Sequence, residues 1–140
     1  MRSGSAQFWP LLLCTTFMTV ACGSGPRGQL QTVTLSPATA NAQQFPDGQV
    51  SFTASGIFSN SQTPVPLTSK DVFWCVGSSS GQCDGFILPG AQVAQTGVAQ
   101  CSPSFAGTVT VLAGTLSGTA PMPDMGQQLK IFGSAKLTCP

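Results

Sequence analysis

Apolar and polar residues alternate along most of the chain after residue 29, and glycine, proline, asparagine and serine interrupt the alternation at short intervals. Alternation with a period of two places one face of a β-strand in a core and the other face in solvent. Six segments follow this pattern: Leu30 to Thr39, Gln49 to Asn60, Asp71 to Val76, Gln92 to Cys101, Gly107 to Thr115 and Gln128 to Cys139. Short strands of this kind, separated by turns, predict an all-β antiparallel sandwich of about seven strands over residues 30–140.

The parity of the apolar positions predicts which side chains face the core. Trp74 stands midway between two valines at two-residue spacing, so we expect it to anchor the core rather than to serve as an exposed platform for a ligand. In the last segment Leu129, Ile131 and Leu137 have the same parity, and we expect them to share one side of the strand.

The N-terminal residues follow a different pattern. Residues 1–7 are short and polar with Arg2 as the basic side chain, and residues 8–21 are mostly apolar without a charge. This arrangement is typical of a signal peptide, and the apolar run is too short to cross a bilayer comfortably as a helix. The sequence therefore predicts a cleaved export signal over residues 1–21.

The end of this segment indicates the kind of signal. Thr19-Val20-Ala21-Cys22 resembles the bacterial lipobox, in which small residues precede a cysteine that is acylated and becomes the mature N-terminus, although the lipobox usually has Leu at the position of Thr19. We expect residues 22–29 to be a lipidated Cys22, carrying palmitate or a similar chain, followed by a flexible tether. The alternative is an ordinary secretory signal that leaves Cys22 as a thiol. Because Gly23 replaces the retention-signal Asp of enteric bacteria, we expect the outer membrane rather than the inner membrane.

Charge and composition exclude several classes of function. Residues 22–140 carry four basic and four acidic side chains without a basic stripe, which argues against a nucleic acid partner. The chain has no His, Glu or Tyr, so it cannot build a Ser-His-Asp or Cys-His arrangement or a His-containing zinc site. We therefore expect a protein that is not an enzyme and that holds no cofactor or metal.

The mature chain resembles a bacterial immunoglobulin-like domain of group 2, the module of intimin- and invasin-type surface proteins. The matching segments, in chain order, are Val33 to Pro37, Phe52 to Asn60, Leu67 to Ser69 with Val72 to Trp74, Thr96 to Ala99, and Ala106 to Val111. The resemblance implies an immunoglobulin-like sandwich and often an adhesive or surface setting, and it implies no catalytic residues. The family usually lacks cysteines, whereas this chain has four after Cys22.

These four cysteines predict two disulfides. Cys14 leaves with the signal peptide, and Cys75, Cys83, Cys101 and Cys139 form an even set in an oxidising compartment. The order of strands favours Cys75–Cys83 with Cys101–Cys139, and Cys75–Cys101 is the main alternative. We expect all four to gather at the end of the sandwich where the last strand finishes.

These observations together predict a non-enzymatic lipoprotein of the cell envelope, with one immunoglobulin-like domain that acts in interaction, adhesion or structure. Its expected partners are the membrane, through Cys22, and an envelope protein or polysaccharide. The alternative is a carbohydrate-binding module, which needs exposed aromatic side chains on one face. The candidates for that face are Phe73, Phe86, Phe105 and Phe132, of which Phe73 and Phe132 have the outward parity.

Overall fold

A computed structural model describes residues 28–84, 90–118 and 126–140, and it is an all-β structure, as the alternation predicts. The described residues form ten strands and two short 3-10 helices. The elements are β1 (Leu30–Ser36), β2 (Thr39–Asn41), η1 (Ala42–Gln44), η2 (Pro46–Gly48), β3 (Gln49–Ser51), β4 (Thr53–Phe58), β5 (Val65–Leu67), β6 (Phe73–Gly77), β7 (Ala91–Val93), β8 (Val98–Cys101), β9 (Gly107–Leu116) and β10 (Leu129–Cys139). The strand number exceeds the expected seven because three of the predicted segments each form two strands, and because β5 lies outside the predicted segments.

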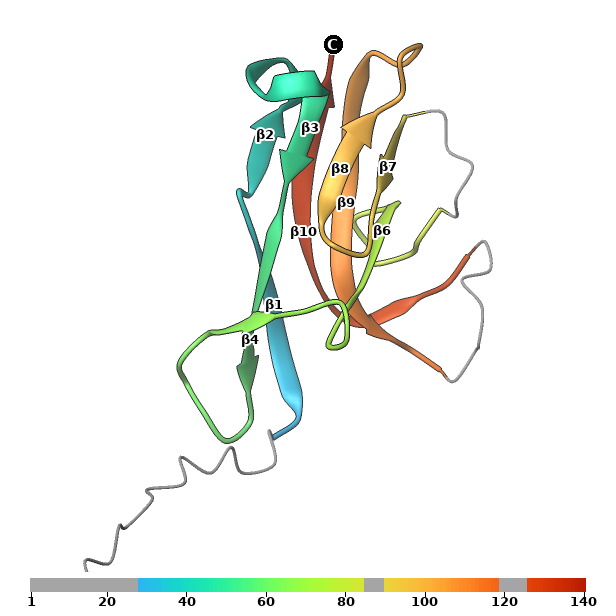
Figure 1. Ribbon diagram of the computed structural model, residues 1–140. Helices are drawn as coiled ribbons and strands as arrows, with labels where there is room; N and C mark the ends of the chain where they lie inside the picture. Colours follow the sequence, from blue (N-terminus) through green and yellow to red (C-terminus); the bar gives the residue numbers. More distant parts are fainter. Residues whose placement is uncertain (1–27, 85–89, 119–125) are drawn as a thin grey trace, which may run out of the picture.

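The strands form two layers (Figure 1). One layer is a four-stranded sheet in the order β2-β10-β9-β6. The other layer consists of two three-stranded sheets, β1-β4-β5 and β3-β8-β7, which are joined where the chain passes from β3 to β4 through Phe52. The halves of one long predicted strand, Gln49 to Asn60, thus pair with different neighbours.

The first predicted strand changes layers. β1 pairs antiparallel with β4, and after the cis Ser36–Pro37 peptide bond the chain continues as β2, which pairs parallel with β10. Proline has no backbone N–H to donate to a sheet, so it interrupts the pairing at this point. The expectation of purely antiparallel pairing is therefore wrong at β2, while the other paired strands in the described residues are antiparallel.

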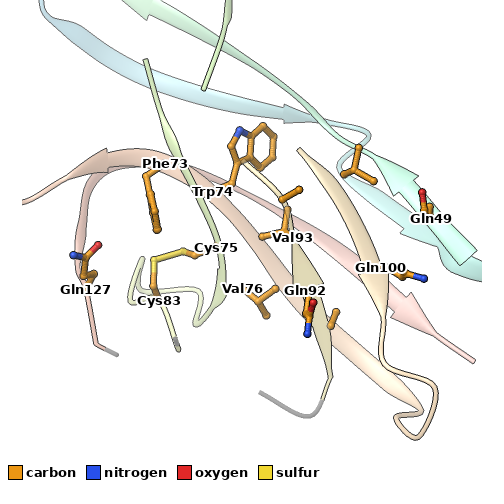
Figure 2. Close-up of a pocket in the computed structure, with 13 residues that line it drawn as sticks. Gln49, Phe73, Trp74, Cys75, Val76, Cys83, Gln92, Val93, Gln100 and Gln127 are labelled. Carbon is orange, nitrogen blue, oxygen red and sulfur yellow. A yellow bond between two sulfur atoms is a disulfide. The ribbon is translucent and has the colours of Figure 1, made fainter. Parts of the chain in front are cut away.

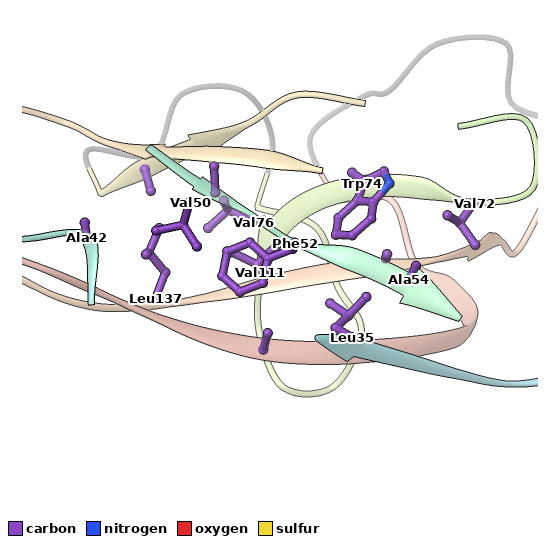
Figure 3. Close-up of a cluster of buried hydrophobic side chains, with 14 of the residues drawn as sticks. Leu35, Ala42, Val50, Phe52, Ala54, Val72, Trp74, Val76, Val111 and Leu137 are labelled. Atoms are coloured by element: carbon purple, nitrogen blue, oxygen red, sulfur yellow. The ribbon is translucent and has the colours of Figure 1, made fainter. Parts of the chain in front are cut away.

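The main core lies between the two layers (Figure 3). Val50, Phe52 and Ala54 enter it from the β3–β4 side, and Trp74 enters it from β6 with 4% of its surface exposed. Alternate residues of a strand point to one face, so the same parity that predicts these positions from the sequence places them together here. Burying one large apolar side chain contributes about 1.5–3 kcal/mol, so this cluster is the principal source of stability.

A second apolar cluster lies on the opposite face of the four-stranded sheet. Its buried members are Cys75, Cys83, Leu112 and Leu129, and Phe73, Leu116 and Phe132 pack against it. Leu129 reaches this face because the pairing of β10 with β9 shifts between Leu129 and Ile131, a β-bulge that reverses the parity of the strand. The prediction that Leu129 shares a face with Leu137 is therefore wrong.

The predicted strand from Gln92 to Cys101 is a hairpin instead. β7 and β8 pair antiparallel around a turn in which the Gly97 N–H donates to the Ala94 carbonyl oxygen at 2.9 Å. Gly97 has a φ of +83°, a left-handed conformation that glycine adopts without strain. The glycine that interrupts the alternation of this segment is thus the residue that closes the turn.

The two disulfides join Cys75 to Cys83 and Cys101 to Cys139, which is the pairing that the sequence favours. They do not gather at one end. Cys139 is paired with Gly107 at the end of β9, whereas Cys75 is paired with Leu112, five residues further along the same strand, or roughly 17 Å away at strand spacing. Cys139 packs in the main core and Cys75 in the second cluster, so the disulfides also lie on opposite faces of the sheet.

The N-terminal side of the domain lies at the end opposite to the C-terminus (Figure 1). There the Gln29 N–H donates to Ser59 Oγ at 3.0 Å and the Ser59 N–H donates to the Gln29 carbonyl oxygen at 2.8 Å, so the domain already holds Gln29, a residue that the sequence assigns to the tether. Within the described residues no helix has the length and apolar character needed to cross a membrane. The predicted signal peptide and Cys22 lie outside the described residues.

Candidate functional site

A groove of about 540 Å³ runs between β6 and the β7–β8 hairpin (Figure 2). This volume falls within the range of small-ligand sites in proteins. The residues that line the groove are Gln49, Phe73, Trp74, Cys75, Val76, Cys83, Ala91, Gln92, Val93, Ala94, Val98, Gln100 and Gln127.

The edge of β6 is closed by the side chain of Gln95 from the turn of the hairpin. Gln95 Oε1 accepts a hydrogen bond from the Trp74 N–H at 3.1 Å, and Gln95 Nε2 donates to the Trp74 carbonyl oxygen at 2.9 Å. A side-chain amide presents the same donor and acceptor as a backbone peptide, so Gln95 replaces one residue of a neighbouring strand. This pair of bonds fastens the hairpin to the other layer and fixes one end of the groove.

Further along, the edge of β6 is held by the segment that leads out of the first disulfide. The Asp84 N–H donates to the Val76 carbonyl oxygen at 2.9 Å, and the Cys83 N–H donates to the Gln127 carbonyl oxygen at 2.8 Å. The Cys75–Cys83 disulfide lies beside Phe73 in this wall of the groove (Figure 2). Because a covalent bond and a packed ring fix it, this wall is preformed.

The opposite wall carries a row of glutamines. Gln49 on β3 is paired with Gln100 on β8, which is paired with Gln92 on β7, so the three side chains cross the sheet in one register row. All three are exposed. Residues that are neighbours across a sheet lie about 5 Å apart, so the row offers closely spaced neutral donors and acceptors.

No charged side chain belongs to the part of the groove that the structure describes. The described residues likewise contain no group of three or more His, Cys, Asp or Glu side chains that could hold a metal ion. The two sulfur atoms in the groove are in a disulfide and therefore do not act as thiolate nucleophiles. What the lining offers chemically is neutral hydrogen bonding beside apolar surface.

The phenylalanines that were candidates for an exposed carbohydrate-binding face do not share one surface in the described residues. Phe73 and Phe132 are both paired with Gly114, on either side of it, so they share one register row on the outer face of the sheet. Both are half-buried against the second cluster, and only Phe73 lines the groove. Phe105 packs against the main core, and Phe86 lies outside the described residues.

The glutamines of the groove and the role of Gln95 were not predicted from the sequence. One signal could have found two of them: Gln92 and Gln100 are equally distant from Thr96, so a hairpin centred on the Thr96-Gly97 turn makes them cross-strand partners. No local signal brings Gln49 or Gln127 to the same place, because they arrive from other parts of the chain.

Comparisons with protein-family models and with curated proteins return no match for this chain.

Proposed function

We propose that this protein is a non-enzymatic, lipid-anchored component of the bacterial cell envelope whose immunoglobulin-like domain binds a neutral ligand in the groove between β6 and β7. The single observation that supports a binding role is the groove itself. The Cys75–Cys83 disulfide fixes one wall of the groove, and a row of neutral glutamine amides lies on the other wall. Rigid sites lose little conformational entropy on binding, which favours affinity.

The order of the strands supports the proposed immunoglobulin-like sandwich, and the bacterial group 2 type is proposed on the sequence resemblance. The sheet β2-β10-β9-β6 corresponds to strands A′, G, F and C of that fold, and the other layer, with β1 beside β4 and β3 beside β8 and β7, corresponds to A, B, E and D. The buried Trp74 on β6 takes the place of the strand C tryptophan in immunoglobulin domains.

The anchor is proposed from the sequence at Cys22 and fits the position of the domain's N-terminal end. The chain enters the domain at Gln29, at the end far from Cys139 and Pro140 (Figure 1). Neither Gln29 nor Ser59, where the chain enters, lines the groove, so a tether at this end leaves the groove accessible to ligands. Attachment to the outer membrane is part of the proposal, on the identity of Gly23.

Carbohydrate binding is the second candidate function. The observation that favours it is the exposed row of Gln49, Gln100 and Gln92, whose amides match the hydroxyl groups of a neutral sugar, with Phe73 in the facing wall. It is a narrower form of the first candidate, in which the neutral ligand is a sugar.

The Cys22→Ser substitution is expected to abolish incorporation of a radiolabelled fatty acid, because the serine hydroxyl does not become the acylated mature N-terminus. The measurement is palmitate labelling of the full chain expressed in a bacterium. Cys14→Ser, which changes a cysteine within the predicted signal peptide, is the matched control and should leave labelling unchanged. Labelling that persists in the Cys22→Ser protein would refute the anchor.

The Ala94→Lys substitution is expected to reduce capture of the envelope ligand about tenfold, because it places a long charged side chain on the exposed rim of an uncharged groove. The assay compares binding of purified envelope polysaccharides and surface proteins to the unlipidated Cys22→Ser protein with and without the second change. Ser51→Lys adds the same charge at an exposed position of β3 that does not line the groove, and should bind normally. Equal loss in both variants, or turnover of any of these ligands by the pure protein, would contradict the proposal.

A further inference from the structure

The outward edge of β7 presents backbone groups that no described residue satisfies. Among the described strands, β7 pairs only with β8. The Ser102 N–H donates to the Gly90 carbonyl oxygen at 3.0 Å and the Ala94 N–H donates to the Val98 carbonyl oxygen at 2.8 Å, so Gly90 and Ala94 direct their backbone groups towards β8. Backbone groups alternate in direction along a strand. The N–H and C=O groups of Ala91 and Val93 therefore point away from β8, into the groove that these two residues line.

Two other edge strands, β6 and β5, have features that hinder pairing with an added strand. On β6 the groups of Trp74 are bonded to Gln95, and the Val76 carbonyl oxygen is bonded to Asp84. β5 has Pro66 at its centre, which has no N–H to donate. β7, with the sequence Ala-Gln-Val, has neither a proline nor a charged residue. An unprotected edge is the usual template for an added strand.

The burial of this edge favours a partner strand that forms hydrogen bonds with its backbone groups. Ala91 is only 4% exposed, so its outward peptide groups lie deep in the groove, while Val93 is half-buried nearer the surface. Buried backbone groups without a hydrogen-bond partner are destabilising, and a bound strand would supply the missing partners. A strand that pairs with β7 meets donor and acceptor pairs at every second residue, roughly 6.8 Å apart, which is the repeat of an extended polypeptide.

We infer that the groove binds an extended peptide segment of a partner protein by strand addition to β7, an inference that rests on the proposed binding function and names its ligand class. In the bound peptide, the side chains opposite Ala91 and Val93 would face inwards, towards Trp74 and Val76, so we expect them to be apolar. The peptide side chain opposite Gln92 would face outwards, beside the neutral glutamine row, so we expect it to be polar and uncharged. The partner segment thus alternates small apolar residues with Thr, Ser, Asn or Gln.

The test uses the unlipidated Cys22→Ser protein and a capped synthetic peptide that alternates valine and threonine. We expect the peptide to bind antiparallel, with its valines opposite Ala91 and Val93. Amide hydrogen exchange measured by NMR should then slow at Ala91 and Val93 and stay unchanged at Gln92 and Ala94, whose N–H groups are already directed towards β8.

Two modified peptides separate strand pairing from contact of side chains alone. N-methylation of the valines removes the N–H groups that face β7 and should weaken binding about tenfold or more, whereas N-methylation of the threonines, whose N–H groups face away, should change it little. Equal effects of the two modifications, or no binding of the parent peptide, would overturn the inference.

Two other occupants of the groove are distinguished in the same experiment. Binding of a neutral polysaccharide that Ala94→Lys abolishes, without new protection at Ala91 and Val93, would overturn strand addition and leave the groove as a binding site. Concentration-dependent protection of both amides without peptide would assign the edge to a second copy of this chain, and would also overturn the inference. Failure of the inference is therefore distinct from failure of the proposed function, which the Ala94→Lys and Ser51→Lys comparison decides.

Discussion

Replacing Gly97 by alanine is expected to lower the free energy of unfolding by about 4 kcal/mol, because two penalties coincide at this position. With φ at +83°, any side chain is strained, and a Cβ placed there would stand 2.3 Å from the Phe52 carbonyl oxygen and 3.0 Å from the Trp74 ring. The Phe52 N–H also donates to the Gly97 carbonyl oxygen at 2.9 Å, so the turn cannot move away without losing a bond between β3–β4 and the hairpin. Urea unfolding measures the change.

Gly48 is the matched control for this prediction. It has a φ of +65°, and a Cβ built on it would meet no atom within 4 Å. Gly48→Ala should therefore cost only the conformational penalty, about 1 kcal/mol. If the two variants lose the same free energy, the contact with Phe52 and Trp74 is not what excludes a side chain at Gly97.

Removing the Cys101–Cys139 disulfide is expected to destabilise the domain by about 4 kcal/mol, compared with about 2.5 kcal/mol for Cys75–Cys83. The first bond spans 38 residues of the chain and the second spans 8, and a longer closed loop restricts the unfolded chain more. The measurement is equilibrium unfolding of the two double variants in which both cysteines of a pair become alanine.

The two double variants are each other's control, because each removes one disulfide and two sulfur atoms. Both bonds bury sulfur against apolar side chains, Cys139 in the main core and Cys75 with Cys83 in the second cluster. A larger loss for the Cys75–Cys83 pair would mean that packing of the second cluster, rather than the length of the closed loop, dominates the contribution of these bonds.

Local alternation predicted the strands well where each strand has one buried face throughout. The segment around Trp74 became β6, and the segment from Gly107 became β9, with the expected side chains in the core. The prediction failed where a single residue changes the geometry. Lys130 adds a residue at the bulge of β10 and moves Leu129 to the other face, and the left-handed Gly97 turns one predicted strand into two.

The second apolar cluster also escaped prediction. Leu112 and Phe132 have the parity of the outward face, which the alternation assigns to solvent. The segment from Gly77 to Gln82 returns over that face, with the Leu129 N–H donating to the Gly81 carbonyl oxygen at 2.9 Å, and shields the cluster. A period of two identifies the face of a strand but contains no information about which loops cover it.

The all-β class, the buried position of Trp74 and the favoured pairing of the cysteines could be predicted without coordinates, because these depend on residue type and on spacing along a strand. The candidate site depends instead on how the layers pack. Gln49, Gln92 and Gln127 belong to three separate parts of the chain, and they surround one groove only because β6 lies beside the β7–β8 hairpin. The open edge of β7 also depends on how the strands pack. Whether a backbone group is paired depends on which strands become neighbours, and the type of residue does not reveal it.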